Sequence, residues 1–363
     1  MAKDIPRFMK AVLLVGHGGL DKLDYRDDVP TPSPGPGEVL IAVGGAGMNN
    51  TDINTRTGWY AQENRDATAV DAEADTVKPW NRASLTFPRI QGADIAGRIV
   101  AVGDGIASAR IGERVLVDAW ICNPSDRLAD PVYIGSERDG GYGEYVAVPA
   151  ANAHRIESAL SDAELATFPC AYTTAENMLH RSGLVAGETV MVTGASGGVG
   201  SALVRLAKRR GARVLAIAGA AKEAQVRKAG ADLFLARDTE DLVDAVEALL
   251  GGDAVALAAD VVGGPGFRTC IDVLRKGGRY VTAGAIAGPY VELDLRTLYL
   301  RDITLYGATV TDAEVFPNLV GYIERGEIRP LVERTYPLSR IRDAQRDFAA
   351  KTHVGKLVLI PGA

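Results

Sequence analysis

The run VMVTGASGGVG at residues 190–200 constrains the fold of this 363-residue chain more than any other segment. An apolar stretch of strand length, a cluster of glycines and the helix-forming sequence SALVRLAKRRG follow one another directly. Such a turn needs Gly197 where the backbone must approach a pyrophosphate, and Gly200 where the helix must pack closely on the strand. The free N–H groups of the first helical turn would then face the phosphates. The segment predicts a dinucleotide-binding turn.

The sequence around this turn indicates a whole domain of the same kind. From Glu188 onward, apolar runs of strand length alternate with segments of helical period, which is typical of βαβ units around a parallel sheet. Without this context a glycine cluster would indicate only a turn. Ala195 replaces the first glycine of G-x-G-x-x-G, so we expect Gly194 to supply the turn. The expected cofactor contacts in the turn and in the later run GRYVTAGA are Gly194, Ser196, Gly197, Gly198, Val199, Gly200 and Gly284.

The end of the second strand of this domain indicates the choice of cofactor. The sequence there is Ala-Gly-Ala-Ala-Lys at residues 218–222, with no carboxylate to hold the ribose 2′-hydroxyl of NAD or to repel the 2′-phosphate of NADP. Lys222, and Arg237 after the next strand, are placed to meet that phosphate. The alternative is that both are ordinary solvated surface cations. We expect NADPH to be preferred over NADH.

The remainder of the chain predicts a second, β-rich domain. Strand-like runs bounded by Gly, Asp or Pro follow one another at the spacing of a small antiparallel barrel, and helix-forming sequence is scarce before residue 160. The tail HVGKLVLIP adds a strand that we expect to return to this domain. The polar stretch 61–86 is interpreted as a solvated surface loop, with a functional lid as the alternative. The expected strands are 10–14, 38–43, 95–102, 114–117 and 144–148.

Charge and composition exclude several classes of function. A net charge of -6 with no stripe of Lys and Arg argues against nucleic acid as a partner. No run approaches the roughly 18 apolar residues that span a bilayer, and the opening MAKDIPRFMK lacks a signal-peptide pattern, so we expect a soluble cytoplasmic protein without a membrane partner. Three cysteines are too few for a disulfide framework or a four-cysteine zinc lobe.

Several motifs in order along the chain resemble the medium-chain dehydrogenase/reductase superfamily, and within it the zinc-free quinone oxidoreductase and enoyl reductase branch. The resemblance covers nearly the whole chain. It implies a GroES-like β-barrel catalytic domain, built from residues 1–160 and 309–363, around a doubly wound Rossmann domain at 161–308. It also implies an active site in the cleft between them, and a homodimer. The motifs are GPGEVLIAV, GMNNTDINTRTGWY, FPRIQGADIAGRIVAVG, IGERVLV, GGYGEYVAVP, ATFPCAYTTAENML, VTGASGGVG and GKLVLI.

The resemblance also bears on zinc. The alcohol dehydrogenases of the superfamily hold a catalytic zinc with a cysteine, a Gly-His-Glu motif and a later cysteine or aspartate. Matched by position, Asn49 replaces the first cysteine, Ala93 the histidine and Asp94 the glutamate, while Cys170 keeps a ligand-type residue. Zinc needs three imidazole, thiolate or carboxylate ligands around an open position. We therefore expect no catalytic metal.

Without a metal, another group must stabilise charge on the substrate. Tyr60 matches a tyrosine proposed as proton donor in the enoyl reductases, and a phenol can donate to a developing enolate. The alternative is that Trp59-Tyr60 lines a pocket or belongs to the core. Asn49 is a candidate donor to the same oxygen or to the nicotinamide ribose. Thr174 matches a residue that contacts the nicotinamide ring in relatives.

Three functions remain open at this point. The leading one is NADPH-dependent hydride transfer, without a metal, to a quinone or to an α,β-unsaturated carbonyl compound. The second is a zinc-dependent alcohol dehydrogenase with unrecognised ligands. The third is a protein that binds NADPH without turnover. Short-chain reductases require Tyr-x-x-x-Lys, and no tyrosine of this chain is followed by Lys at that spacing.

Overall fold

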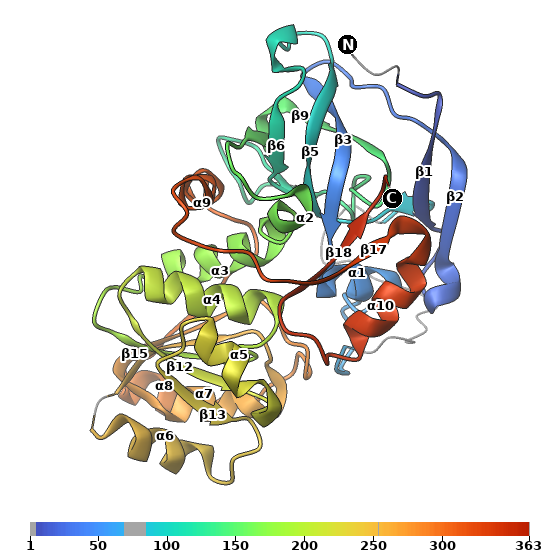
Figure 1. Ribbon diagram of the computed structural model, residues 1–363. Coiled ribbons are helices and arrows are strands. Elements are labelled where there is room, and N and C mark those ends of the chain that lie inside the picture. The colour runs from blue at the N-terminus through green and yellow to red at the C-terminus, as the bar shows by residue number, and fades with distance from the viewer. Residues whose placement is uncertain (1–4, 69–84, 253, 363) are drawn as a thin grey trace. The chain divides into compact units, whose positions relative to one another are not determined.

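The computed structural model describes residues 5–68, 85–252 and 254–362. Contacts divide the chain into two compact units, which Figure 1 shows with many of their helices and strands labelled. Unit 1 contains Met1–Asn64, Ala69–Cys170 and Asp312–Ala363, and unit 2 contains Arg65–Thr68 and Ala171–Thr311. Of the polar stretch predicted as a loop at 61–86, residues 69–84 lie outside the described residues.

Unit 2 is a doubly wound α/β domain. Its six strands pair in parallel throughout, in the order β13-β12-β11-β14-β15-β16, which is the 3-2-1-4-5-6 order of a Rossmann fold. The predicted fold class is therefore confirmed. The strands are β11 (Thr189–Val192), β12 (Arg213–Ala218), β13 (Leu233–Ala236), β14 (Val255–Asp260), β15 (Leu274–Thr282) and β16 (Thr304–Gly307). The helices are α3 (Pro169–Arg181), which begins in unit 1, α4 (Gly198–Arg209), α5 (Glu223–Lys228), α6 (Leu242–Leu250), α7 (Phe267–Asp272) and α8 (Leu295–Leu300).

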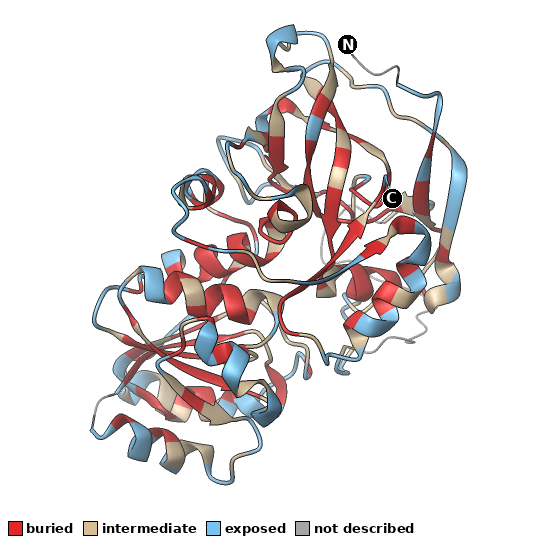
Figure 2. Ribbon diagram, in the orientation of Figure 1, coloured by how far each residue is buried: buried red, intermediate tan, exposed pale blue. Residues whose placement is uncertain are grey.

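The central strands of unit 2 show why this sequence adopts a parallel sheet. Every residue of β11 and β14 is buried, as expected for strands that are covered by helices on both faces. Helix α4 buries its small and apolar residues, among them Ala202, Leu203 and Leu206. It ends where Gly211 takes a φ of 78°, a left-handed conformation that favours glycine. Figure 2 shows the buried strands against helices that also carry exposed stretches.

Unit 1 is mainly antiparallel β-structure built from both ends of the chain. Its largest sheet has the order β10-β6-β5-β3-β18-β17, with β9 also on β3, and a second sheet has the order β2-β1-β4. These strands are β1 (Phe8–Leu14), β2 (Leu23–Pro30), β3 (Glu38–Gly47), β4 (Arg89–Ile90), β5 (Asp94–Val102), β6 (Arg114–Val117), β9 (Tyr145–Pro149), β10 (Ala153–Arg155), β17 (Val332–Pro337) and β18 (Lys356–Ile360). The ribbon β7 (Trp120–Ile121) and β8 (Val132–Tyr133) and the helices α2 (Asp162–Leu165), α9 (Val315–Glu324) and α10 (Ile341–Ala349) complete it.

Two features of unit 1 position its polar residues. The C-terminal strand β18 pairs antiparallel with β3, which confirms the expected return of the tail. The motif NNTDINTRT forms helix α1 (Asn50–Thr57), an exception to the expected scarcity of helix in this part of the chain. It begins after Asn49 and ends at Gly58, whose φ is 71°. Among the described residues, none of the helices is long and apolar enough to span a membrane.

Candidate functional site

The glycine turn of unit 2 has the geometry that the sequence predicts for a phosphate cradle. Gly194 has a φ of 57°, so it makes the turn after β11 in place of the missing first glycine. A Cβ on Gly200 would lie 2.1 Å from the Gly194 carbonyl oxygen, so a side chain there would push α4 off the turn. A Cβ on Gly197 would meet only that oxygen, at 3.5 Å, and Gly197 is exposed. The turn therefore has no room for a side chain at Gly200, whereas it has room for one at Gly197.

A buried carboxylate that no sequence pattern singled out braces the loops beside this turn. Asp260, at the end of β14, accepts hydrogen bonds from the hydroxyl groups of Thr193 at 2.5 Å and Tyr280 at 2.7 Å. The backbone N–H of Val262 donates to it at 2.8 Å. Strands β11 and β14 are the neighbours at which the strand order reverses, where ligands of doubly wound sheets bind. Asp260 therefore stabilises the loop ends that would surround a dinucleotide.

The two predicted phosphate-binding cations lie close together. Ala218 pairs with Ala236 where β12 and β13 end, and the backbone N–H of Arg237 donates to the Ala218 carbonyl at 2.8 Å. Lys222 is half-buried at the end of a short 3₁₀ helix. Desolvation lowers the pKa of Lys222, and the nearby charge of Arg237 lowers it further. Two like charges at one strand end favour an anion between them.

The other predicted cofactor contacts of unit 2 are half-buried. Gly284 follows β15, and a Cβ there would lie 3.2 Å from the Val261 carbonyl oxygen. Thr174 lies on α3, and Ser196 and Val199 lie in the glycine turn. Their roles as cofactor contacts remain predictions.

In unit 1 a buried lysine connects two of the positions that match zinc ligands. The Lys356 ammonium lies 2.7 Å from a carboxylate oxygen of Asp94 and donates to the Asn49 side-chain oxygen at 2.5 Å. Asp94 is fully buried, Lys356 is 3% exposed and Asn49 is 7% exposed. The second Asp94 oxygen accepts from the backbone N–H of Cys170 at 2.5 Å. We call Asn49, Asp94, Cys170 and Lys356 the lysine cluster.

A glycine on the central strand allows this cluster to form. Gly47 of β3 pairs with Asp94 of β5 on one side and with Val358 of β18 on the other. A Cβ on Gly47 would lie 2.6 Å from the Asp94 carboxylate and 2.2 Å from the Ala166 carbonyl oxygen. Because Gly47 has no side chain, the carboxylate and the ammonium can meet across β3.

Asp52 on α1 is the second buried carboxylate of unit 1. One of its oxygens accepts from both the backbone N–H of Asn49 at 2.7 Å and the Tyr142 hydroxyl at 2.8 Å. The Gln91 amide donates to the Asp52 carbonyl at 2.9 Å. Desolvation raises the pKa of Asp52 to about 6, although the hydrogen bonds from Asn49 and Tyr142 and the charge of Lys356 oppose the shift. Asp52 thus fixes the start of α1 and the backbone of Asn49.

The lysine cluster does not have the composition of a zinc site. Asn49 offers an amide, Ala93 offers no ligand, and the Asp94 carboxylate is neutralised by Lys356. Burial raises the pKa of the Cys170 thiol to about 11, with Asp94 adding to the shift, so this cysteine stays protonated at neutral pH. The described residues contain no group of three or more His, Cys, Asp or Glu side chains placed to hold a metal ion.

Tyr60 follows α1, and its ring packs edge-on against Trp59 with 5.4 Å between the ring centroids. The residue is 41% exposed, yet its hydroxyl lies against the side chains of Thr51 and Asn54. Desolvation of this hydroxyl raises its pKa above the ordinary value, so the group remains protonated and able to donate. The catalytic role of Tyr60 stays a prediction.

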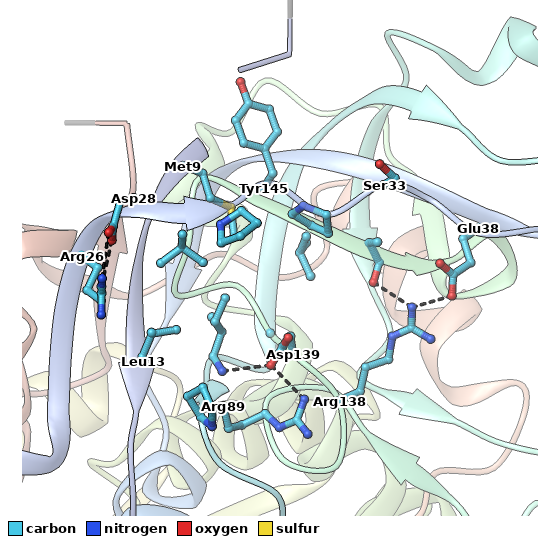
Figure 3. Close-up of a pocket in the computed structure, with 18 of the residues that line it drawn as sticks. Met9, Leu13, Arg26, Asp28, Ser33, Glu38, Arg89, Arg138, Asp139 and Tyr145 are labelled. Atoms are coloured by element: carbon cyan, nitrogen blue, oxygen red, sulfur yellow. Dashed lines mark hydrogen bonds and ion pairs between the residues drawn. The ribbon is translucent and has the colours of Figure 1, made fainter. Parts of the chain in front are cut away.

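A separate pocket of unit 1, shown in Figure 3, contains none of these residues. It has a volume of about 630 Å³ and is lined by apolar residues, three arginines and the carboxylates of Asp28, Glu38, Glu137 and Asp139. Each arginine has a carboxylate partner: Arg26 with Asp28 at 2.7 Å, Arg89 with Asp139 at 2.8 Å and Arg138 with Glu38 at 2.5 Å. Because these charges neutralise one another, the pocket is a poorer candidate for binding an anionic cofactor than the glycine turn.

Two family models match the two parts of the chain. Residues 35–158 match the alcohol dehydrogenase GroES-like domain, and residues 198–325 match the family described as zinc-binding dehydrogenase. A solved structure of a proposed alcohol dehydrogenase from Sinorhizobium meliloti is 55% identical over 98% of this chain and 97% of its own, with a TM-score of 0.92. The cobalt- and zinc-bound thermostable alcohol dehydrogenase of Pyrobaculum aerophilum is 32% identical over 98% of this chain and all of its own, with a TM-score of 0.81.

Curated relatives bear different names. The NAD-dependent alcohol dehydrogenase of Sulfurisphaera tokodaii is 27% identical over 97% of this chain and 100% of its own length. The quinone oxidoreductase of Lama guanicoe is 26% identical over 98% of each chain. The chain belongs to the medium-chain dehydrogenase/reductase superfamily and is an oxidoreductase of that type.

Proposed function

We propose that this protein transfers a hydride from NADPH to a quinone or an α,β-unsaturated carbonyl compound without a catalytic metal. The observation that carries the proposal is the Asp94–Lys356 pair, which places an ammonium group among the positions that match zinc ligands. That cation neutralises Asp94 and contacts Asn49, so the buried charges of the cluster are paired without a metal.

The glycine turn of unit 2 supports the nucleotide half of the proposal. The N–H groups at the start of α4 would bind the pyrophosphate, and the exposed Gly197 leaves room for its approach. Lys222 and Arg237 would bind the 2′-phosphate of NADPH. The S. tokodaii relative is named for NAD. The assignment of NADPH to this chain rests instead on the residues at the end of β12.

Tyr60 and Asn49 of unit 1 would act on the substrate. NADPH, when bound, would supply a hydride to the electrophilic carbon and become NADP⁺, so negative charge would develop on the substrate oxygen. The Asn49 amide would donate a hydrogen bond to that oxygen, and the Tyr60 hydroxyl would supply the proton that completes the reduction. Solvent then returns a proton to Tyr60.

A substrate screen combined with metal analysis tests the proposal. Purified protein should oxidise NADPH with at least one of four compound classes: quinones, 2-alkenals, enones and enoyl thioesters. It should contain no stoichiometric zinc and keep its activity after treatment with a chelator. One zinc per chain, with alcohol oxidation that a chelator abolishes, would establish instead a zinc-dependent alcohol dehydrogenase. The P. aerophilum relative is a zinc- and cobalt-bound alcohol dehydrogenase. Tight NADPH binding with no oxidation would identify a non-catalytic binding protein.

We also propose that the protein forms a homodimer through unit 2. Strand β16 is at the end of the sheet order, so one of its edges has no partner strand among the described residues of the unit. Large apolar side chains of α8, the helix that precedes β16 in the chain, are exposed: Leu295 by 65%, Tyr299 by 63% and Leu300 by 62%. Light scattering should give twice the mass of one chain, and Leu300→Asp should give a monomer. A wild-type monomer would contradict the proposal.

A further inference from the structure

The side-chain amide of Asn49 has a nitrogen that is unpaired in the described part of the chain, which the proposed reaction alone does not explain. Its oxygen accepts the short hydrogen bond from Lys356, while its nitrogen, Nδ2, is buried and has no hydrogen-bond partner among the described residues. An unpaired buried donor costs free energy of folding, so each one calls for an explanation, such as a role in binding or catalysis. The backbone of Asn49 is itself fixed, because its N–H donates to Asp52 at 2.7 Å.

We propose that Lys356 is a positioning residue, which holds the Asn49 side chain so that Nδ2 is free to bind the substrate oxygen. This inference rests on the proposed function, because it names the donor that acts when the hydride arrives. The occupant of the unpaired position would be a carbonyl or quinone oxygen, which accepts hydrogen bonds and becomes more negative during the reaction.

The orientation follows from the chemistry of the two groups. An ammonium only donates, so it cannot face the NH₂ end of an amide without a donor–donor clash. The oxygen of Asn49 must therefore point at Lys356, and the two N–H bonds must point away from it. A cation bound at the amide oxygen also draws electron density from the nitrogen, which strengthens Nδ2 as a donor.

Asp94 holds the Lys356 side chain in place. Its carboxylate lies 2.7 Å from the ammonium and is fixed at its other oxygen by the backbone N–H of Cys170. A structural role for this ion pair would explain the burial of both charges. It would not explain why Lys356 makes its second contact with the one residue of the cluster that has an unpaired buried amide nitrogen.

The test removes both charges at once, because removing only the lysine would leave Asp94 buried and unpaired. In Lys356→Met/Asp94→Asn, which we call the charge-free variant, the amide oxygen that replaces the carboxylate can still accept from the backbone N–H of Cys170. We expect kcat with NADPH and 9,10-phenanthrenequinone or 2-cyclohexen-1-one to fall about tenfold or more, with the Kd for NADPH changed less than about twofold. As a matched control, Glu176→Gln/Arg210→Met removes an ion pair of unit 2, whose atoms lie 2.5 Å apart, and should leave kcat within about twofold.

A double-mutant cycle separates positioning from general disruption. Asn49→Ala should lower kcat by about 10²-fold, as loss of a donor to a developing oxyanion does. If Lys356 acts through Asn49, adding Asn49→Ala to the charge-free variant should give no lower kcat than Asn49→Ala alone. Fully additive losses, or a charge-free variant within twofold of wild type, would overturn the positioning role.

A second readout does not depend on turnover. The side-chain ¹⁵N–¹H signals of Asn49, assigned by their loss in Asn49→Ala, should shift in the charge-free variant and stay in place in the Glu176→Gln/Arg210→Met control. Unchanged Asn49 signals would refute the contact with Lys356. If these signals shift but the wild type reduces no quinone or enone, the proposed function fails while the lysine–amide contact stands, and the inferred substrate role falls with the function.

Discussion

The glycine turn of unit 2 and the lysine cluster of unit 1 are built on opposite principles. The turn uses backbone groups from one short segment, residues 194–200, and depends on the missing side chains of Gly194, Gly197 and Gly200. The cluster uses side chains from residues 49, 94 and 356, and it is stable because its buried charges are paired. The glycine turn should lose cofactor binding when a methyl group is added. The lysine cluster should lose its function when a charge or a proton donor is removed.

The largest effect should come from adding one methyl group to the turn. Gly200→Ala would place a Cβ 2.1 Å from the Gly194 carbonyl oxygen and 2.8 Å from the Ala195 Cα, so backbone must move. We expect a loss of about 3 kcal/mol or more of unfolding free energy and no detectable NADPH binding. Thermal unfolding and fluorescence titration with NADPH would measure both quantities.

Gly197→Ala is the matched control for that change. Its Cβ would meet only an ordinary contact at 3.5 Å, and its φ of -78° suits any residue. Stability should stay within about 0.5 kcal/mol, while NADPH affinity falls because the methyl group occupies the approach to the pyrophosphate. If both variants bound NADPH as the wild type does, the turn would not be the phosphate site.

A pH effect of similar size is expected in unit 1. The pKa of Asp52 is raised from 3.8 to about 6 by burial, so the folded protein binds this proton more tightly than the unfolded chain. Its contribution to stability is therefore full below pH 4 and is lost as the pH rises to about 6. At about 1.4 kcal/mol per pKa unit, the loss is at most about 3 kcal/mol.

Asp52→Asn tests this contribution with little structural change, because a single oxygen of Asp52 accepts both of its hydrogen bonds and an amide oxygen can replace it. Lys356 lowers this pKa and Asp94 raises it, and both remain in the variant. Asp118, whose pKa is also raised to about 6 by burial, gives the wild type a second contribution in the same pH range. Denaturant unfolding from pH 4 to 7 should give a flatter profile for Asp52→Asn. A profile identical to that of the wild type would mean that Asp52 does not cause the pH dependence.

The same contrast explains how much could be predicted from the sequence. The turn could be predicted because its seven residues are contiguous and the glycines have steric reasons for their places. Asn49 and Asp94 were selected through the family resemblance. Lys356 was missed because its role depends on strand β18 lying beside β3, a pairing across more than 300 residues. A lysine at the start of the apolar run KLVLI was the available signal.

An intermediate effect is expected at Tyr60, where only a hydroxyl is removed. Tyr60→Phe should lower kcat by about 10²-fold through loss of a positioned proton donor, with NADPH affinity nearly unchanged because the cofactor site belongs to unit 2. Tyr145→Phe, at a tyrosine that lines the pocket of Figure 3, is the control and should keep its activity. A wild-type kcat in Tyr60→Phe would mean that the tyrosine only lines a pocket.

The smallest effect should come from the cations at the end of β12, because each contributes one charge to a site that backbone groups already form. A charged hydrogen bond is worth roughly 1.5–3 kcal/mol, so Lys222→Ala should lower kcat/KM for NADPH about tenfold. NADH has no 2′-phosphate, so its kcat/KM should not change. Lys228→Ala, an exposed cation at the end of α5, is the matched control and should affect neither cofactor. Steady-state rates with both cofactors decide the matter. If Lys222→Ala weakens NADPH and NADH equally, or if the wild type uses both equally well, Lys222 and Arg237 are solvated surface cations and the preference for NADPH is wrong.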